Sequence, residues 1–393
     1  MLVSALGDGM SMVAVAWLAV QIAPVDRAGV WTGLAVAAYA LPAPIGAALL
    51  ARPMRRLRAG QLVAADASVR AVALGAVAIL AVAGVLNPVG YVALLAISSL
   101  LHAWGSAGTY TLVAELLPDE DRVTGNAVLS TFGQAAIVVG PAIAGGLTAL
   151  IGPGPVIGAD AASFAILAIA GWAVARRQHA TVAAGPSTGA WRTIAGRPRL
   201  LRLIAVTCAF FFLYGPVEVA LPVHVAHESH GSPGLLGLYW TVFGVGATVG
   251  AIGAPLLRHR PPRWVVVGII VGWGAALLPL GATDAVAPGL VGFAAGGLIY
   301  GPFSAVSTAL FQRGTPPEAL SGVLAARAAL TTPATALGTL LGGPVVTAIG
   351  GRPTLLLSAL LTIALGVAVA AVLPLTRRSV VGSVVATDVV SGA

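Results

Sequence analysis

The sequence predicts an all-α membrane protein in which twelve transmembrane helices form two pseudo-symmetric six-helix bundles. Three observations lead to this fold class. Of the 393 residues, 58% are hydrophobic and only 9% are charged, whereas soluble domains carry about 25% charged residues. The hydrophobic residues fall into twelve runs of about 20 residues, which is the length that crosses a bilayer as a helix. Segments of the first half also recur in the second half.

The twelve predicted spans follow one another closely, and Pro, Gly or Arg bounds each of them. Their ranges are 2–23, 28–51, 61–85, 89–116, 125–150, 155–175, 201–226, 234–257, 264–282, 288–311, 320–348 and 353–375. The connecting loops are short except for residues 176–199, a polar stretch near the midpoint. We therefore expect an N-terminal bundle over 1–175, a cytoplasmic linker over 176–199 and a C-terminal bundle with a short tail over 200–393.

The orientation follows from the arginines, which supply all 21 basic residues. Arginines cluster in the loops after spans two, six, eight and twelve, whereas the alternate loops hold only Arg27 and Arg352. Because basic loops stay on the cytoplasmic side, both termini are expected there. We predict a multi-pass protein of the bacterial cytoplasmic membrane.

The two halves share sequence as well as span number. The segment "GAALLARPMRR" from Gly46 matches "GAPLLRHRPPR" from Gly253, and residues 125–146 align with residues 322–343 without a gap. Two parallel halves joined by a cytoplasmic linker are typical of secondary transporters. In such proteins the substrate site lies between the halves.

Four stretches carry a family resemblance along the whole chain. They are "SALGDGMSMVAVAW" in span one, "AELLPDEDRVTGNAVLSTFGQAAIVVGPAIAGGL" from Ala114, "GADAASFAILA" from Gly158 and "RGTPPEALSGVLAARAAL" from Arg313. With these stretches the sequence resembles the major facilitator superfamily, and within it the bacterial enterobactin-exporter-like and macrolide-efflux-like group. The resemblance implies the major facilitator fold, a monomer, alternating access and export of a small hydrophobic or amphipathic molecule, usually against a proton gradient.

The resemblance also marks candidate gating residues. After span two the family places a Gly, an acidic residue and a basic cluster; here Leu50 and Ala51 stand in place of the acid. The matching residues are Gly46, Arg52, Arg55 and Arg56. In span five, "GPAIAGG" resembles an antiporter-associated motif, and its residues are Gly140, Pro141, Gly145 and Gly146. Close helix packing through these glycines is the alternative interpretation.

Three carboxylates inside spans are candidates for proton coupling, because a charge at a bilayer centre needs a partner or a function. Glu218 follows Gly215–Pro216 in span seven, a broken-helix signal, and we rank it first. Asp8 in span one is the second candidate. Asp160 in span six is more readily explained as structural. For Asp8 and Asp160 the competing hypothesis is a hydrogen bond that fixes helix packing.

Other polar and aromatic residues are candidates for the substrate or charge network. Asp66 and Arg70 are four residues apart, which favours a helical ion pair. Arg327 in span eleven is expected to face the interior and to meet Asp8, Glu218 or an anionic group of the substrate. Candidates for the cavity wall, each of which helix packing also explains, are Tyr39, His102, Trp104, Tyr110, Tyr214, Trp240 and Tyr300.

The leading functional hypothesis is proton-coupled export of a drug-like, macrolide-like or siderophore-like molecule. The alternatives are an importer or facilitator of a small organic solute and a membrane sensor that does not transport. No hydrolase pattern and no nucleotide-binding loop occur in the sequence, so we do not expect an enzyme or an ATP-driven pump. We expect protons, a small molecule and lipid as partners, and no cofactor, metal site or nucleic acid. The "HVAHESHG" stretch is interpreted as a polar outer loop.

Overall fold

The computed structural model describes residues 2–54, 56–118, 120–177, 190–283 and 285–388. Arg55 and most of the predicted linker, residues 178–189, therefore lie outside the described residues. Within the described ranges all regular structure is helical, and twelve segments are long and apolar enough to cross a membrane. The predicted fold class is confirmed, and each span end lies within three residues of its predicted position.

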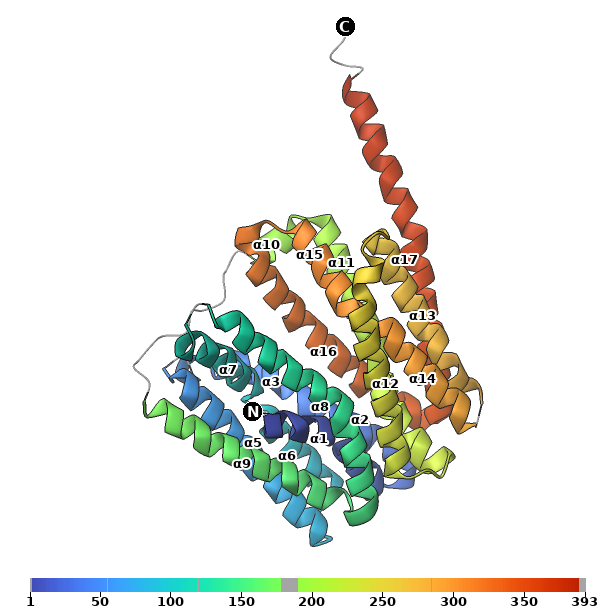
Figure 1. Cartoon of the computed structure of the whole chain (residues 1–393). Coiled ribbons are helices and arrows are strands. Elements are labelled where there is room, and N and C mark those ends of the chain that lie inside the picture. The colour runs from blue at the N-terminus through green and yellow to red at the C-terminus, as the bar shows by residue number, and fades with distance from the viewer. Residues whose placement is uncertain (1, 55, 119, 178–189, 284, 389–393) are drawn as a thin grey trace.

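The helices fall into two groups in Figure 1, blue to green and yellow-green to red. The first group, which we call the N-half, contains α1 (Leu2–Ile22), η1 (Val25–Arg27), α2 (Ala28–Ala40), α3 (Pro42–Leu49), α4 (Ala51–Met54), α5 (Ala59–Val82), α6 (Pro88–Ser99), α7 (His102–Leu116), α8 (Arg122–Ile151) and α9 (Pro153–Ala175). The second group, the C-half, contains α10 (Ala190–Ala195), α11 (Pro198–Val223), η2 (His224–Glu228), α12 (Pro233–Gly253), η3 (Ala254–Leu257), α13 (Pro262–Ala282), α14 (Val286–Tyr300), α15 (Phe303–Gly314), α16 (Pro317–Ile349) and α17 (Gly351–Asp388).

Proline and glycine set the ends of many helices. Pro42, Pro88 and Pro153 are among the prolines that stand in the first turn of a helix, where the missing N–H costs nothing. Gly152 and Gly350 follow α8 and α16 with φ of 84° and 91°, a conformation that favours glycine and ends a helix. The two equivalent helices α8 and α16 therefore both end at a glycine with positive φ.

Several helix boundaries differ from the sequence prediction. Spans two, four and ten are each divided into two consecutive helices. The breaks in spans two and four lie side by side, because a Cβ on Gly46 of α3 would overlap the carbonyl of Leu100, and Gly46 O accepts a hydrogen bond from Trp104 Nε1 at 3.3 Å. In addition, α10 forms inside the predicted linker and buries Ile194 against the C-half, and α17 continues beyond the predicted end at 375.

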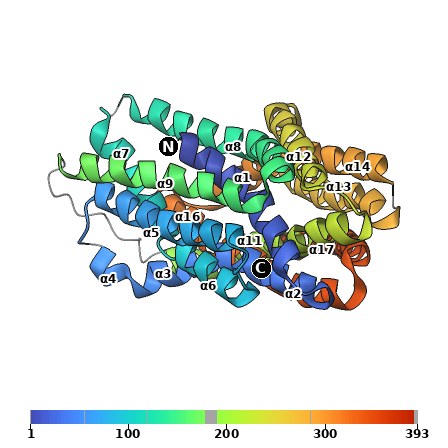
Figure 2. The same ribbon diagram turned by 90° about the horizontal axis from the view of Figure 1, so that it is seen from below.

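The loops with most of the described arginines lie at one end of the helices. We call this the arginine-rich end, defined by Arg52, Arg56, Arg258 and Arg313. Arg52 and Arg56 of the predicted gating loop are exposed there. Figures 1 and 2 show the N-half and the C-half side by side, with α2 and α8 of the first next to α12 and α16 of the second.

The two halves meet through glycines at the end opposite the arginine-rich end. Gly145 of α8 lies against Gly237 of α12, and Gly29 of α2 lies against Gly343 of α16. Near the second contact Val30 N donates a hydrogen bond to Thr347 Oγ1 at 3.1 Å. Helix α8 pairs with α12 as its equivalent α16 pairs with α2, so the internal repeat produces two matching contacts.

The burial of α1 shows where the space between the halves is closed. Its residues from Val13 to Val20 are at most 7% exposed, whereas Leu2 and Val3 are 40% and 63% exposed. The second part of α1 lies toward the end where the glycine contacts form. The halves are therefore closed together at that end and separated toward the arginine-rich end.

A matched pair of substitutions tests whether glycine contacts hold the closed end. A Cβ at Gly145 would lie 3.0 Å from Gly237 Cα and Pro233 O, whereas a Cβ at Gly146 meets nothing within 4 Å. Overpacking costs about 1–3 kcal/mol, and about 1.4 kcal/mol changes a population tenfold. Gly145→Val should therefore open the closed end about tenfold more often, and Gly146→Val should not.

The measurement is the labelling rate of a cysteine that replaces Ala16 in the cavity wall. A membrane-impermeant maleimide is added from the closed side, in a Cys208→Ser background because Cys208 is the one native cysteine. Equal labelling rates in the Gly145→Val and Gly146→Val variants would contradict the conclusion that glycine contacts hold this end closed.

Candidate functional site

A cavity of about 310 Å³ lies between the halves, and α1, α2, α11, α12 and α16 contribute its wall. This volume is at the lower end of the range for small-molecule sites. Its described lining is largely apolar, with polar groups on both sides. The lining residues are Ser11, Met12, Val15, Ala16, Val36, Tyr39, Ala40, Glu218, Trp240, Thr332, Thr335, Ala336 and Thr339.

Glu218 is the carboxylate of the C-half wall. Its Oε2 accepts a hydrogen bond from Thr339 Oγ1 at 3.1 Å. The backbones of α11 and α16 come close at this level, because a Cβ at Gly215 would lie within contact of Thr339 N and a Cβ at Gly342 within 2.7 Å of Pro216 Cα. Among the described lining residues Glu218 is the one acid, and no Arg or His accompanies it. It can therefore hold a proton or a cationic group of a ligand.

Two hydroxyl groups of the N-half wall are bonded to charged groups behind the wall. Tyr39 Oη donates to Asp8 Oδ1 at 3.1 Å and accepts from Arg70 Nη2 at 2.8 Å. Ser11 Oγ donates to Asp160 Oδ2 at 2.6 Å. The cavity surface and the charged groups are therefore connected by direct hydrogen bonds.

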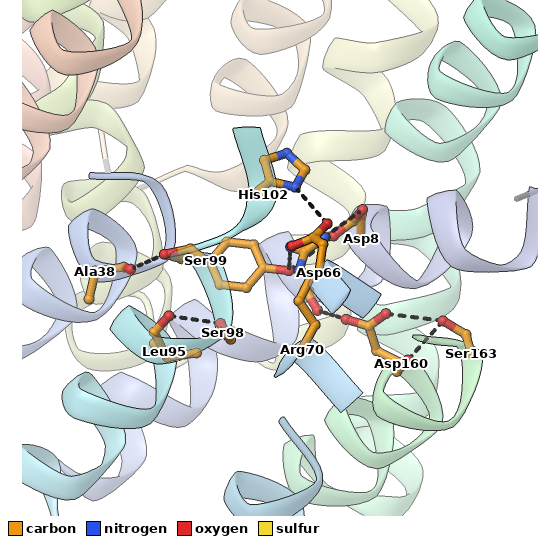
Figure 3. Close-up of polar contacts among 12 residues, drawn as sticks. Asp8, Ala38, Asp66, Arg70, Leu95, Ser98, Ser99, His102, Asp160 and Ser163 are labelled. Carbon is orange, nitrogen blue, oxygen red and sulfur yellow. Dashed lines mark hydrogen bonds and ion pairs between the residues drawn. The ribbon is translucent and has the colours of Figure 1, made fainter. Parts of the chain in front are cut away.

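The charged groups form a compact cluster around Arg70 of α5, shown in Figure 3. Arg70 Nη2 lies 2.9 Å from Asp8 Oδ1, and the Arg70 side chain is 3% exposed. Its guanidinium also stacks over the ring of Phe164, with Cζ 4.3 Å from the centroid. The expected Asp66–Arg70 ion pair is therefore wrong. The Arg70 guanidinium pairs instead with Asp8 of α1.

Asp66 points instead toward α7. Its Oδ2 lies 3.9 Å from His102 Nδ1, and Figure 3 shows the two side chains facing each other. The other oxygen, Oδ1, is buried and has no hydrogen-bond partner among the described residues. His102 is 49% exposed, so this pair connects the buried cluster with the surface.

Asp160 is the most deeply buried member of the cluster at 1% exposure. It bonds to Ser11 as described above, and Ser163 Oγ donates to its backbone carbonyl at 2.8 Å. Together with Asp8 and Asp66 it makes three carboxylates beside one guanidinium.

Glycines make room for these side chains. A Cβ at Gly7 would overlap the Asp160 carboxylate, and one at Gly105 would overlap that of Asp66. A Cβ at Gly9 would overlap the carbonyl of Ala136 on α8, and Gly140 faces Gly9 from the same helix. In the "GDG" of the first span, the two glycines therefore let α1 pack closely against Asp160 and against α8, on either side of Asp8.

The expected pairing of Arg327 with Asp8 or Glu218 is wrong. Its Nη1 and Nη2 donate to Thr308 Oγ1 at 2.9 Å and Ser307 Oγ at 2.8 Å, and its guanidinium stacks on Phe311. The exposed residues of this part of α16 include Ala325, Ala328 and Thr332. At about 100° per residue, these positions lie on the other side of the helix from Arg327. The guanidinium therefore points into the C-half and away from the cavity.

Two of the seven aromatic and histidine candidates line the cavity, namely Tyr39 and Trp240. Tyr110 is 57% exposed, and Trp104 bonds to the backbone of Gly46. Tyr214 and Tyr300 pack within the C-half, where their rings contact Trp273 at 5.9 Å and Phe303 at 6.0 Å. These residues and His102 lie outside the wall, because helix rotation directs them to other neighbours.

Sequence reasoning missed the hydroxyl groups of the cavity. Thr332, Thr335 and Thr339 line it from α16, and Ser11 lines it from α1. The threonines recur at intervals of three and four residues, which places them on one face of a helix. That spacing in an otherwise apolar span was the available signal. The bond between Tyr39 and Asp8 joins two helices and left no signal in either segment.

The polar stretch after span seven forms a structural cap at the closed end. Glu228 accepts hydrogen bonds from Gly351 N at 2.6 Å and Arg352 N at 2.9 Å, at the start of α17. His224 Nδ1 lies 2.6 Å from the same carboxylate. Within the described residues no group of three or more His, Cys, Asp or Glu side chains could hold a metal ion.

Comparison of the sequence with known proteins shows the family to which the chain belongs. The sequence model of the Major Facilitator Superfamily matches residues 1–283. The multidrug efflux pump Tap of Mycobacterium tuberculosis is 29% identical over 407 aligned positions, covering 96% of this chain and 92% of that protein. An uncharacterised MFS-type transporter of Sinorhizobium fredii, y4rN, is 28% identical, and the match covers 63% of each chain, less than two thirds of its length.

Solved structures agree with the fold. A bacterial homologue of the iron transporter ferroportin, in an inward-facing state, superposes with a TM-score of 0.71 over 94% of this chain and 96% of its own. Its sequence identity to this chain is 18%, so the likeness concerns the fold alone.

A double substitution tests the pairing of Arg70 with Asp8. Arg70→Gln leaves the carboxylates of the cluster without their cation, which should cost about 3–5 kcal/mol of stability. Adding Asp8→Asn removes one of these carboxylates and should restore part of the loss. The measurement is the midpoint of thermal unfolding of the purified protein in detergent.

The control for this experiment is Arg27→Gln. Arg27 pairs with Asp26 at the surface, where the two side chains are 70% and 75% exposed, so its loss should change stability by about 1 kcal/mol or less. A double variant as unstable as Arg70→Gln alone would show that Asp8 does not stabilise Arg70.

Proposed function

Because the chain belongs to the major facilitator superfamily, and is thus a multi-pass secondary transporter with twelve spans, we propose that it exports small lipophilic molecules in exchange for protons. One observation carries the proposal. A largely apolar cavity lies between two helix bundles that are closed at one end, and its wall contains a carboxylate, Glu218, without a cationic partner among the described lining residues.

The direction of transport is part of the proposal. Basic loops stay in the cytoplasm, so the arginine-rich end is assigned to the cytoplasmic side. The cavity is then closed on the outside and accessible from the cytoplasm, which suits the loading state of an exporter. Rocking of the halves that separates the glycine contacts and brings the arginine-rich ends together would expose the same cavity to the outside.

The charge of the cavity narrows the substrate class. Glu218 attracts cationic groups and repels anions, and the guanidinium of Arg327 points away. We therefore expect neutral or cationic lipophiles, such as dyes and macrolides, to bind better than an anionic catecholate siderophore. The distant likeness to a multidrug efflux pump supports this preference.

Glu218 is proposed to couple transport to protons. An ionised Glu218 holds the substrate when the cavity faces the cytoplasm, and protonation from outside would remove that attraction and release the substrate. The hydrogen bond from Thr339 at 3.1 Å positions the carboxylate toward the cavity. This exchange of a proton for a substrate at one group gives antiport without a second coupling ion.

Everted membrane vesicles with an inside-acid pH gradient test the proposal. Adding a lipophilic cation to vesicles with the wild-type protein should collapse the gradient, as reported by a pH-sensitive dye. Glu218→Gln should abolish the substrate-dependent collapse, because the group that exchanges the proton is gone. Glu120→Gln is the matched control, since Glu120 is exposed outside the cavity.

The substrate panel separates the alternatives. Collapse caused by a catecholate siderophore and not by cations would overturn the proposed substrate charge. Binding without any collapse would overturn proton antiport and favour a facilitator or a sensor.

A further inference from the structure

We infer that Thr339 of α16 is a positioning residue that keeps the Glu218 carboxyl group hydrogen-bonded in both of its charge states, ionised and neutral. This inference rests on the proposed exchange of a proton at Glu218. It adds the group that lets Glu218 take up and give off that proton at one position in the cavity wall. Thr339 and Glu218 both line the cavity, and Thr339 is 1% exposed.

The hydroxyl group of Thr339 has two acceptors within reach. Its Oγ1 lies 3.1 Å from Glu218 Oε2 and 3.1 Å from the carbonyl oxygen of Thr335, one turn earlier in α16. A hydroxyl group has one proton to donate and two lone pairs that accept. Thr339 can therefore direct its proton to either oxygen and can also accept a hydrogen bond itself.

This choice of partners gives Glu218 a hydrogen bond in each charge state. When Glu218 is ionised, Thr339 donates to Oε2, and such charge-assisted bonds are roughly twice as strong as bonds between neutral groups. When Oε2 carries a proton, the carboxyl O–H donates to Thr339 Oγ1, and Thr339 donates to the carbonyl of Thr335. Glu218 Oε1 makes no hydrogen bond among the described residues, so a proton on Oε1 would lack this acceptor. The proton is therefore held on Oε2.

The backbone around Thr339 is held from both sides. A Cβ on Gly215 of α11 would lie within contact of Thr339 N and Thr335 O. From the N-half, a Cβ on Gly33 of α2 would lie 3.0 Å from Thr339 O. The exchange therefore needs only a rotation of the Thr339 hydroxyl group about its C–O bond, while the helices and the carboxyl group stay in place.

The two bonds set the sign and the size of the effect of removing the hydroxyl group. Glu218 then loses a stronger bond in its ionised form than in its neutral form, so ionisation should need a higher pH. Because both forms lose a bond, the shift reflects only the difference between the two bonds, about 0.5–1 pH unit. A hydroxyl group that bonded only the ionised form would account for a shift of about two pH units.

The other titratable side chains that face Glu218 are phenols. They are Tyr214 on its own helix, Tyr300 on α14 and, across the cavity, Tyr39 on α2. A phenol ordinarily ionises near pH 10, so these groups stay neutral between about pH 5 and pH 9. The guanidinium of Arg327 bonds to Ser307 and Thr308 instead.

The experiment is an infrared titration of the purified full chain in lipid nanodiscs, without any ligand. A protonated carboxyl group has a C=O stretching band that disappears when the group ionises. The part of this band that is missing in Glu218→Gln belongs to Glu218, and its intensity is followed between about pH 5 and pH 9. The pH at which half of this intensity is lost is the midpoint compared between variants.

Thr339→Val removes the hydroxyl group with little change in side-chain volume and should raise the midpoint by about 0.5–1 pH unit. Thr339→Ala should give the same shift and leaves no added methyl group to clash with Glu218. Thr339→Ser keeps a hydroxyl group and should restore the wild-type midpoint. Thr207→Val is the matched control and should leave the midpoint unchanged. Thr207 lies on the helix of Glu218, is 1% exposed and donates to Leu203 O of that helix at 2.7 Å.

The outcomes separate this inference from the proposed function. A wild-type protein in which no Glu218 band titrates would overturn proton exchange at Glu218 itself. A titrating band with the same midpoint in Thr339→Val, Thr339→Ala and Thr207→Val would leave that exchange in place and overturn the role of Thr339. A shift of about two pH units would show that Thr339 bonds only the ionised form. A Thr339→Ser midpoint equal to that of Thr339→Val would show that packing, and not the hydroxyl group, causes the shift.

Discussion

A guanidinium buried in a membrane protein is the constraint on which the N-half depends. Arg70 is 3% exposed, and removing a charge from water is paid back only by close, well-oriented partners. Asp8, Tyr39 and Phe164 supply these partners from three other helices, α1, α2 and α9. The carboxylates of Asp160 and Asp66 lie so close to the backbones of α1 and α7 that glycine is needed at positions 7 and 105. The burial of Arg70 thus constrains which side chains fit at the facing positions of several helices.

The two halves share a backbone plan and differ in chemistry. The glycine contacts repeat, with α8 against α12 and α16 against α2. The charged cluster has no counterpart in the described C-half, where the carboxylate Glu218 is bonded to a hydroxyl group. The repeat therefore explains why the halves make two matching contacts. The differences explain why the cavity has one acid on its C-half side and hydroxyl groups backed by charges on its N-half side.

The fold could be predicted from the sequence because its signals are local. Span length, proline and glycine at helix ends and the distribution of arginine each act within a few residues, and the span ends were accurate to three residues. The pairing of Arg70 was mistaken because helical spacing offered Asp66 as a partner, while the contact with Asp8 depends on how α1 and α5 are packed. Arg327 was misplaced for the same reason, since sequence alone does not give the rotation of α16. Glu218 was found because a carboxylate inside an apolar span is a local signal, although the expected break at Gly215–Pro216 is wrong, since α11 continues through it.

The loop after span two bears on how the transporter changes state. Its arginines lack the acidic residue that the family resemblance led us to expect, and Leu50 and Ala51 occupy the place. Asp66 cannot replace that acid, because it is buried in the N-half and faces His102. In the described part of the chain, the contacts that join the halves are made by small residues at the opposite end. Under the proposed exchange of substrate for a proton at Glu218, the free energy for closing the arginine-rich end would come from binding in the cavity itself.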